Sequence, residues 1–172
     1  MDTVSIVIIV ATALVIVLAI GIPMKIRLGK KSRLIKQGKI IKRKSAFFKQ
    51  AHVFTTKIGG IETIAETIDT NTLNEEKISF KPNYEKSMVV FHNHAAMGSF
   101  GAALRLLLQD GETYSYRFQV EAWNEINNGI SYSDMLGANL LLTAIERAFM
   151  QLDGNTTVKR EKAIYKTKTK FF

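Results

Sequence analysis

The sequence contains no cysteine among its 172 residues. Disulfide frameworks, thiolate zinc sites, cysteine nucleophiles and cysteine-ligated iron–sulfur clusters are therefore excluded. Only two prolines and eleven glycines occur, so the chain is not a low-complexity linker. The G-x-S-x-G, G-x-x-x-x-G-K, H-E-x-x-H and calcium-loop patterns are also missing, which removes the common enzyme and ion-binding signatures. What remains is 47% hydrophobic and 23% charged, a composition that predicts a folded domain.

A charge-free apolar run occupies residues 4–22, with Ser5 and Thr12 as its only polar side chains. A helix of this length nearly matches a hydrocarbon core of about 30 Å. A cleaved secretory signal would carry positive charges before the apolar run, whereas here every nearby cation follows it. We therefore expect residues 1–24 to form one N-terminal transmembrane anchor.

Charge is distributed along the chain in blocks. Residues 25–44 carry ten Lys or Arg and no acid, whereas residues 45–172 carry 14 basic and 14 acidic residues. The formal net charge of +9 therefore comes from the segment behind the apolar run. Such a basic flank stays cytoplasmic. We expect a single-pass protein of the cell membrane, with the N-terminus outside and the domain facing the cytosol.

The basic block predicts a juxtamembrane stalk over 25–46 that lies against anionic lipid headgroups, because each cation near such a surface gains about 1 kcal/mol. The expected headgroup contacts are Lys25, Arg27, Lys30, Lys31, Arg33 and Lys36. A topology determinant, a dedicated acidic-lipid sensor and a nucleic-acid strip all fit a run of cations. No aromatic residue interleaves these cations before Phe47, and the domain beyond them is neutral, so no nucleic acid is expected as a partner.

Periodicity in the remaining part, 47–172, predicts a cytosolic α+β domain of order β-α-β-β-β-β-α-β. Strands are expected over 47–56, 77–81, 87–93, 99–109, 112–123 and 163–172, and helices over 61–68 and 132–153. The segment 70–76 reads as a loop, and turns are expected at Pro82-Asn83 and at Asp110-Gly111.

The helix over 132–153 has the strongest helical signal. Ser131 and Asp134 form a capping-box pattern, and apolar residues recur at three- and four-residue steps. This long C-terminal helix should cover an antiparallel sheet, as in a helix-grip cavity fold or a two-layer sandwich. If a cavity separates helix and sheet, we expect its lining to include Phe118, Val120, Leu142 and Phe149.

The only chemically suggestive string is His92-Asn93-His94, because residues two apart on a strand share a face and imidazole binds zinc or iron. A third ligand would be His52, Glu121 or Glu125. Nothing in the sequence requires any of them to lie nearby, so His92, His94 and His52 are weak metal candidates. We expect no metal, no cofactor and no catalytic residue.

The sequence therefore leaves two alternative functions open. The first is a membrane-anchored, non-enzymatic interaction module that docks a protein partner of unknown identity. The alternative is a carrier or sensor of a lipid or small apolar ligand, bound in a cavity between helix and sheet. A packed core favours the module, and an open cavity favours the carrier.

Overall fold

The computed structural model describes residues 29–94, 99–123, 125–126 and 129–164, together with Thr12 and Val15. The chain divides into two compact units, Met1–Gly38 and Lys39–Phe172. The second unit thus begins inside the predicted stalk. Apart from Thr12 and Val15, the predicted anchor over 1–24 lies outside the described residues. None of the described helices is both long and apolar enough to cross a bilayer.

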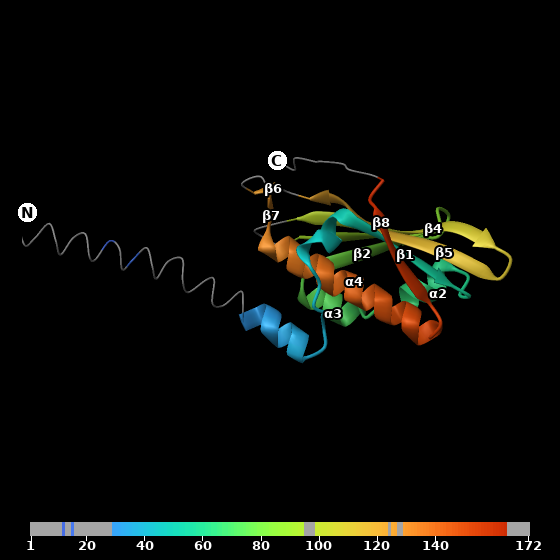
Figure 1. Cartoon of the computed structure of the whole chain (residues 1–172), viewed down its shortest axis with the longest axis horizontal. Helices are drawn as coiled ribbons and strands as arrows, with labels where there is room; N and C mark the ends of the chain where they lie inside the picture. Colours follow the sequence, from blue (N-terminus) through green and yellow to red (C-terminus); the bar gives the residue numbers. More distant parts are fainter. Residues whose placement is uncertain are drawn as a thin grey trace, which may run out of the picture. The chain divides into compact units, whose positions relative to one another are not determined.

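The unit Lys39–Phe172 is built on a six-stranded antiparallel sheet with the strand order β2-β3-β4-β5-β1-β8 (Figure 1). Its strands are β1 (Gln50–Thr56), β2 (Ile78–Asn83), β3 (Met88–Asn93), β4 (Phe100–Asp110), β5 (Thr113–Trp123) and β8 (Thr157–Lys162). A separate short pair joins β6 (Glu125–Ile126) to β7 (Gly129–Ile130). Antiparallel neighbours along this chain need only short connections, which fits the strand spacing in the sequence.

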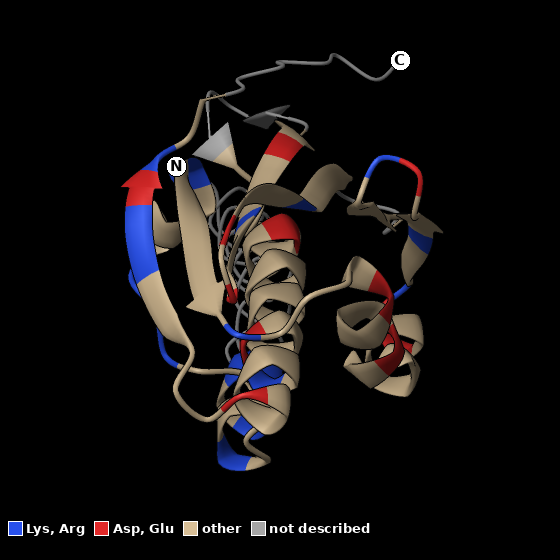
Figure 2. Cartoon of the chain, turned by 90° about the vertical axis from the view of Figure 1, so that its right-hand side faces the viewer, with Lys and Arg blue, Asp and Glu red and all other residues tan. Residues whose placement is uncertain are grey.

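The helices of this unit are η1 (Ser45–Lys49), a 3₁₀ turn, α2 (Ile61–Thr67), α3 (Thr70–Glu75) and α4 (Tyr132–Leu152). Helix α4 runs across the sheet, with α2 and α3 on one side of it (Figure 2). Ser131 caps α4 by accepting a hydrogen bond from the Asp134 backbone N–H, as its sequence predicts. The predicted α+β class, with an antiparallel sheet and a long C-terminal helix, is confirmed.

Helix and sheet approach closely at Gly137. A Cβ atom on this residue would lie 2.8 Å from the Asn93 side-chain nitrogen and 3.2 Å from the Phe100 ring. A larger side chain here would therefore force the helix away from the sheet. Glycine thus sets the distance between the two layers at this end of α4.

Aromatic side chains fill the space between α4 and the sheet. The Phe149 ring stacks on Phe54 with centroids 4.5 Å apart, and its centroid lies 5.4 Å from that of Tyr116. Phe118 and Val120 are buried on the same face of β5. Helix and sheet therefore pack against each other directly.

Three local predictions are wrong, each because tertiary context overrides a local signal. The segment 70–76 contains α3 and not a loop, since Asp69 caps it by accepting from the Thr72 N–H and Leu73 is buried beneath it. Pro82 and Asn83 end strand β2 and do not form a turn. Among the described strands β2 pairs with β3 alone, so Pro82 sits on an edge strand that tolerates a residue without an N–H.

The third error concerns the start of the first strand. Residues 47–49 belong to η1, so the first strand begins at Gln50. The edge strand near the C-terminus is β8 (Thr157–Lys162), which pairs with β1. Residues 165–172 of the strand predicted over 163–172 lie outside the described residues. Strand β8 itself carries the cations Lys159, Arg160 and Lys162, which suit a sheet edge.

The hairpin of β4 and β5 forms as predicted, although its turn is displaced by one residue. Asp110 pairs with Thr113, so the turn residues are Gly111 and Glu112, and Gly111 adopts a φ of 56°. On β5 the expected alternation is incomplete because Arg117 and Gln119 are buried as well. Arg117 pairs with Glu161, and Gln119 lies between this ion pair and that of Arg105 with Glu121, on the face of the sheet opposite α4.

Candidate functional site

A short basic segment, residues 41–44, is fastened to the middle of α4. The Ile41 N–H donates to Thr143 Oγ1 at 3.3 Å, and Asn139 Nδ2 donates to the Ile41 carbonyl at 2.9 Å. Arg43 donates to Thr143 Oγ1 at 2.8 Å and also to Asn139 Oδ1. These bonds connect residues about one hundred positions apart in the chain, so the segment is part of the folded unit.

Arg43 also forms an ion pair with Glu146, and this pair is withdrawn from solvent. The Arg43 side chain is 4% exposed and that of Glu146 is 19% exposed. Burial lowers the pKa of Arg43 and raises the pKa of Glu146, while each charge opposes the shift of the other. A buried charge is costly unless it is paired, so removing either Arg43 or Glu146 would leave the other as an unpaired buried charge.

A surface groove of about 390 Å³ opens beside this pair. Its walls come from the basic segment, from η1 and the start of β1, from α4 and from β8. The lining residues are Ile41, Lys42, Arg43, Lys44, Ala46, Phe47, Gln50, Glu146 and Arg160. Four of these are cations and one is an acid. We call it the basic groove.

The elements around the basic groove fix the positions of its cations. Lys42 and Lys44 flank the anchored Arg43, and the Lys44 carbonyl accepts a hydrogen bond from the Phe47 N–H at 3.1 Å. Arg160 pairs in register with His52 of β1, and this register places it on the α4 side of the edge strand. Basic residues along β8 are visible in Figure 2 at the sheet edge.

His52 pairs in register with Arg160 but does not line the groove. Its side chain is buried opposite Phe118, and neither ring nitrogen has a hydrogen-bond partner. Burial lowers the pKa of His52 to about 4. The Phe47 backbone acts to raise this pKa, whereas the positive charges of Arg43 and Arg160 act to lower it further. His52 is therefore neutral at physiological pH and forms part of the core.

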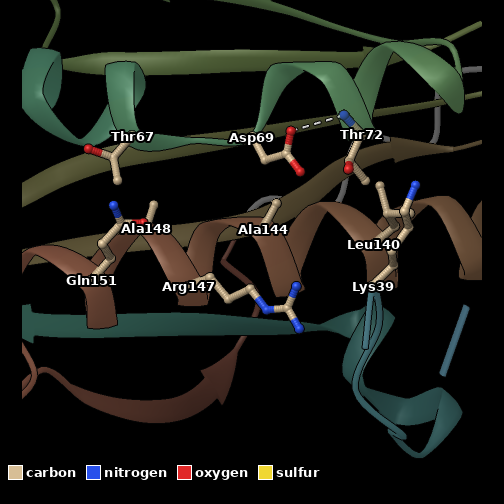
Figure 3. A pocket seen from close by; sticks show the side chains of 9 residues that line it. All are labelled: Lys39, Thr67, Asp69, Thr72, Leu140, Ala144, Arg147, Ala148 and Gln151. Atoms are coloured by element: carbon tan, nitrogen blue, oxygen red, sulfur yellow. Dashed lines mark hydrogen bonds between the residues drawn. The ribbon is translucent and has the colours of Figure 1, made fainter. Parts of the chain in front are cut away.

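A second groove, of about 230 Å³, lies between α4 and the pair α2 and α3 (Figure 3). Several of its polar groups already have structural roles. Lys39 forms an ion pair with Glu75, and the Asp69 carboxylate caps α3 through Thr72, an interaction that lowers the pKa of Asp69. These contacts stabilise α3, and we assign this groove no chemical role.

The structure does not bring the three histidines together. His92 and His94 have ring centroids 6.2 Å apart, and Ser79 Oγ lies 3.2 Å from His94 Nε2. His52 is on the opposite face of the sheet, three strands away. In the described part of the chain, no three His, Asp or Glu side chains lie close enough to hold a metal ion.

The predicted headgroup contacts fall on and before a helix over 29–36 in the unit Met1–Gly38. Lys25 and Arg27 lie outside the described residues. Lys30, Arg33 and Lys36 are exposed, and Lys31 is half-buried.

The four residues predicted to line a cavity lie between α4 and the sheet. Phe118, Val120, Leu142 and Phe149 are all buried, and none of them lines either of the two grooves.

The groove is not evident from the sequence, because residues 25–46 read as one basic stalk. One signal could have revealed the anchor for Arg43. Asn139, Thr143 and Glu146 are spaced by four and three residues, which puts polar groups in one row along an otherwise apolar helix. Such a row needs a polar partner, and Arg43 supplies it.

Comparisons of the chain with protein-family models, with curated proteins and with solved structures return no match.

Proposed function

We propose that this protein is a membrane-anchored, non-enzymatic interaction module whose domain faces the cytosol and whose basic stalk contacts anionic lipid. The observation that carries the proposal is the arrangement of charge: an uncharged apolar run over 4–22 is followed by ten cations and no acid over 25–44. Nineteen apolar residues suit a membrane-spanning helix. Cations confined to one flank favour a cytosolic domain.

The packing of the domain supports the module over the alternative of a lipid carrier. A carrier needs a cavity of several hundred Å³ between helix and sheet. In this protein the Phe149 ring stacks directly on Phe54, and Leu142 and Val120 are buried without lining a groove. The α4 side of the sheet is therefore occupied by protein side chains.

Among the described residues, α2 offers a charged surface for a protein partner, because its acidic residues Glu62 and Glu66 are exposed. Unpaired surface charges favour selective recognition because a partner must offer complementary charges. The face of the sheet opposite α4 is less open, since Ala51, Arg117 and Gln119 are buried there.

The anchoring is tested by alkaline extraction of membranes from cells that express the full chain. We expect the wild type to stay in the membrane pellet in carbonate and in high salt. Val7→Lys with Leu14→Lys should release the protein, since a lysine near the centre of a spanning helix, as in Leu14→Lys, costs about 3 kcal/mol and the second lysine adds to this cost. Val7→Leu with Leu14→Val is the matched control and should stay in the pellet. Release of the wild type by carbonate would contradict the proposal.

A further inference from the structure

The basic groove contains more positive charge than the fold itself uses. Arg43 is occupied by Glu146, Asn139 and Thr143. Within the ranges 29–94, 99–123 and 129–164, no hydrogen bond or ion pair holds the side chains of Lys42, Lys44 or Arg160. Among the described lining residues Glu146 is the single acid, and Arg43 already engages it. Glu146 also interacts electrostatically with Arg160. Besides Arg43, three cations thus share one depression whose described lining offers a single carboxylate.

From this arrangement we propose that the basic groove binds a phosphomonoester group through Lys42, Lys44 and Arg160. A phosphomonoester carries a charge of about −1.5 to −2 at neutral pH and three acceptor oxygens. Arginine presents a planar fork of donors to such a group, and lysine provides a flexible point charge. A singly charged phosphodiester would leave more of the positive charge unmatched, so the groove should distinguish the two.

The groove is preorganised on the side of the basic segment. Arg43 is held by three side chains of α4, and its two neighbours, Lys42 and Lys44, extend from this fixed point. Arg160 comes from β8, more than one hundred residues later, and its backbone is held by the pairing with β1. Because the fold has already fixed these backbones, less ordering is needed when a ligand binds.

The apolar part of the lining suggests where the phosphate comes from. Ile41 and Ala46 are exposed beside the cations, and Phe47 is buried below them. A lipid headgroup would place its phosphate on the cations and the start of its glycerol chain on these residues. The lipid source rests on the proposed function, whereas phosphate binding itself does not.

The proposal is tested by calorimetric titration of the full chain in micelles of an uncharged detergent. The probes are dihexanoyl phosphatidate, glycerol 3-phosphate, inorganic phosphate and dihexanoyl phosphatidylglycerol. We expect phosphatidate to bind at least about tenfold more tightly than phosphatidylglycerol. Phosphatidate binding that is also tighter than glycerol 3-phosphate binding supports a lipid headgroup as the source. Equal affinities for these two support a soluble phosphate compound.

The matched variants remove two positive charges each. Lys44→Gln with Arg160→Gln should weaken binding at least about tenfold, because charge-assisted hydrogen bonds are lost. Lys81→Gln with Lys86→Gln removes two exposed lysines from other parts of the surface and should change the affinity by less than about twofold. All four residues are exposed, so near-wild-type Trp123 fluorescence is expected in both variants and verifies the fold.

Failure to bind either phosphomonoester at about 10 mM would overturn the proposal, as would an equal loss of affinity in the two variants. Failure of the anchoring proposal is recognised separately, by carbonate extraction, because the titration does not depend on how the chain sits in a cell membrane.

Discussion

Replacing Arg43 with methionine tests whether residues 39–44 belong to the fold. Methionine keeps most of the volume of the arginine stem but removes every donor. Glu146 and Asn139 Oδ1 would lose the hydrogen bonds that Arg43 donates, while Thr143 would still donate to the Asn139 carbonyl at 2.7 Å. The main effect is therefore a carboxylate left without its partner.

The magnitude follows from the burial of the pair. Removing one partner of a fully buried ion pair costs about 3–5 kcal/mol. Glu146 retains 19% exposure, so water can relieve part of the loss, and we expect Arg43→Met to lower the free energy of unfolding by about 2–4 kcal/mol. Lys42→Met, at the exposed neighbouring position, should change it by about 0.5 kcal/mol or less.

The assay is denaturant unfolding of the full chain in detergent micelles, followed by the fluorescence of Trp123. This residue is the only tryptophan, and it is buried with its ring centroid 5.6 Å from that of Phe48. Arg43→Met combined with Glu146→Leu should be less destabilised than the two single variants added together, because the double variant leaves no unpaired charge. An Arg43→Met variant as stable as Lys42→Met would refute the reasoning.

Three further predictions concern the core and the histidines. Phe149→Ala should lower the free energy of unfolding by about 3–5 kcal/mol in the same assay, with no change when lipid is added. The control Met150→Ala, at a position 51% exposed, should lower it by about 0.5 kcal/mol or less. A small loss of stability for Phe149→Ala would favour the carrier alternative. Burial lowers the pKa of His52 from 6.5 to about 4, so the unfolded state binds the extra proton in this range and stability should fall as pH drops from 6.5 to 4. The loss should approach about 3 kcal/mol, and unfolding of His52→Leu should show a flatter pH profile; parallel profiles for variant and wild type would contradict this. His92→Ala with His94→Ala should leave stability and metal content unchanged, and elemental analysis that finds stoichiometric zinc only in the wild type would show that these residues bind metal.

Local signals in the sequence predicted the elements that they themselves determine. The cap at Ser131 and the apolar spacing after it locate α4 closely, because a capped amphipathic helix needs no distant residue to define its start. The hairpin of β4 and β5 was equally readable from alternation and from Gly111. The short helix α3 was missed because its stability comes from burying Leu73 against the rest of the unit, which composition does not show.

The basic groove could not be predicted because its walls come from distant parts of the chain. A run of cations such as 25–44 is usually a solvated segment, and nothing local distinguishes Arg43 from its neighbours. Only the polar row of Asn139, Thr143 and Glu146 explains why Arg43 is buried. The position of Arg160 beside the same pair depends on the pairing of β8 with β1, which no local signal in the sequence indicates.

Cysteine labelling of the full chain in intact cells tests the central claim most directly, because the natural sequence contains no cysteine that could interfere. Thr3→Cys places a thiol before the apolar run, and Lys81→Cys places one on an exposed position of β2. A membrane-impermeant maleimide should label Thr3→Cys in intact cells and should label Lys81→Cys only after the membrane is permeabilised. Labelling of Lys81→Cys in intact cells would contradict a membrane-anchored domain that faces the cytosol.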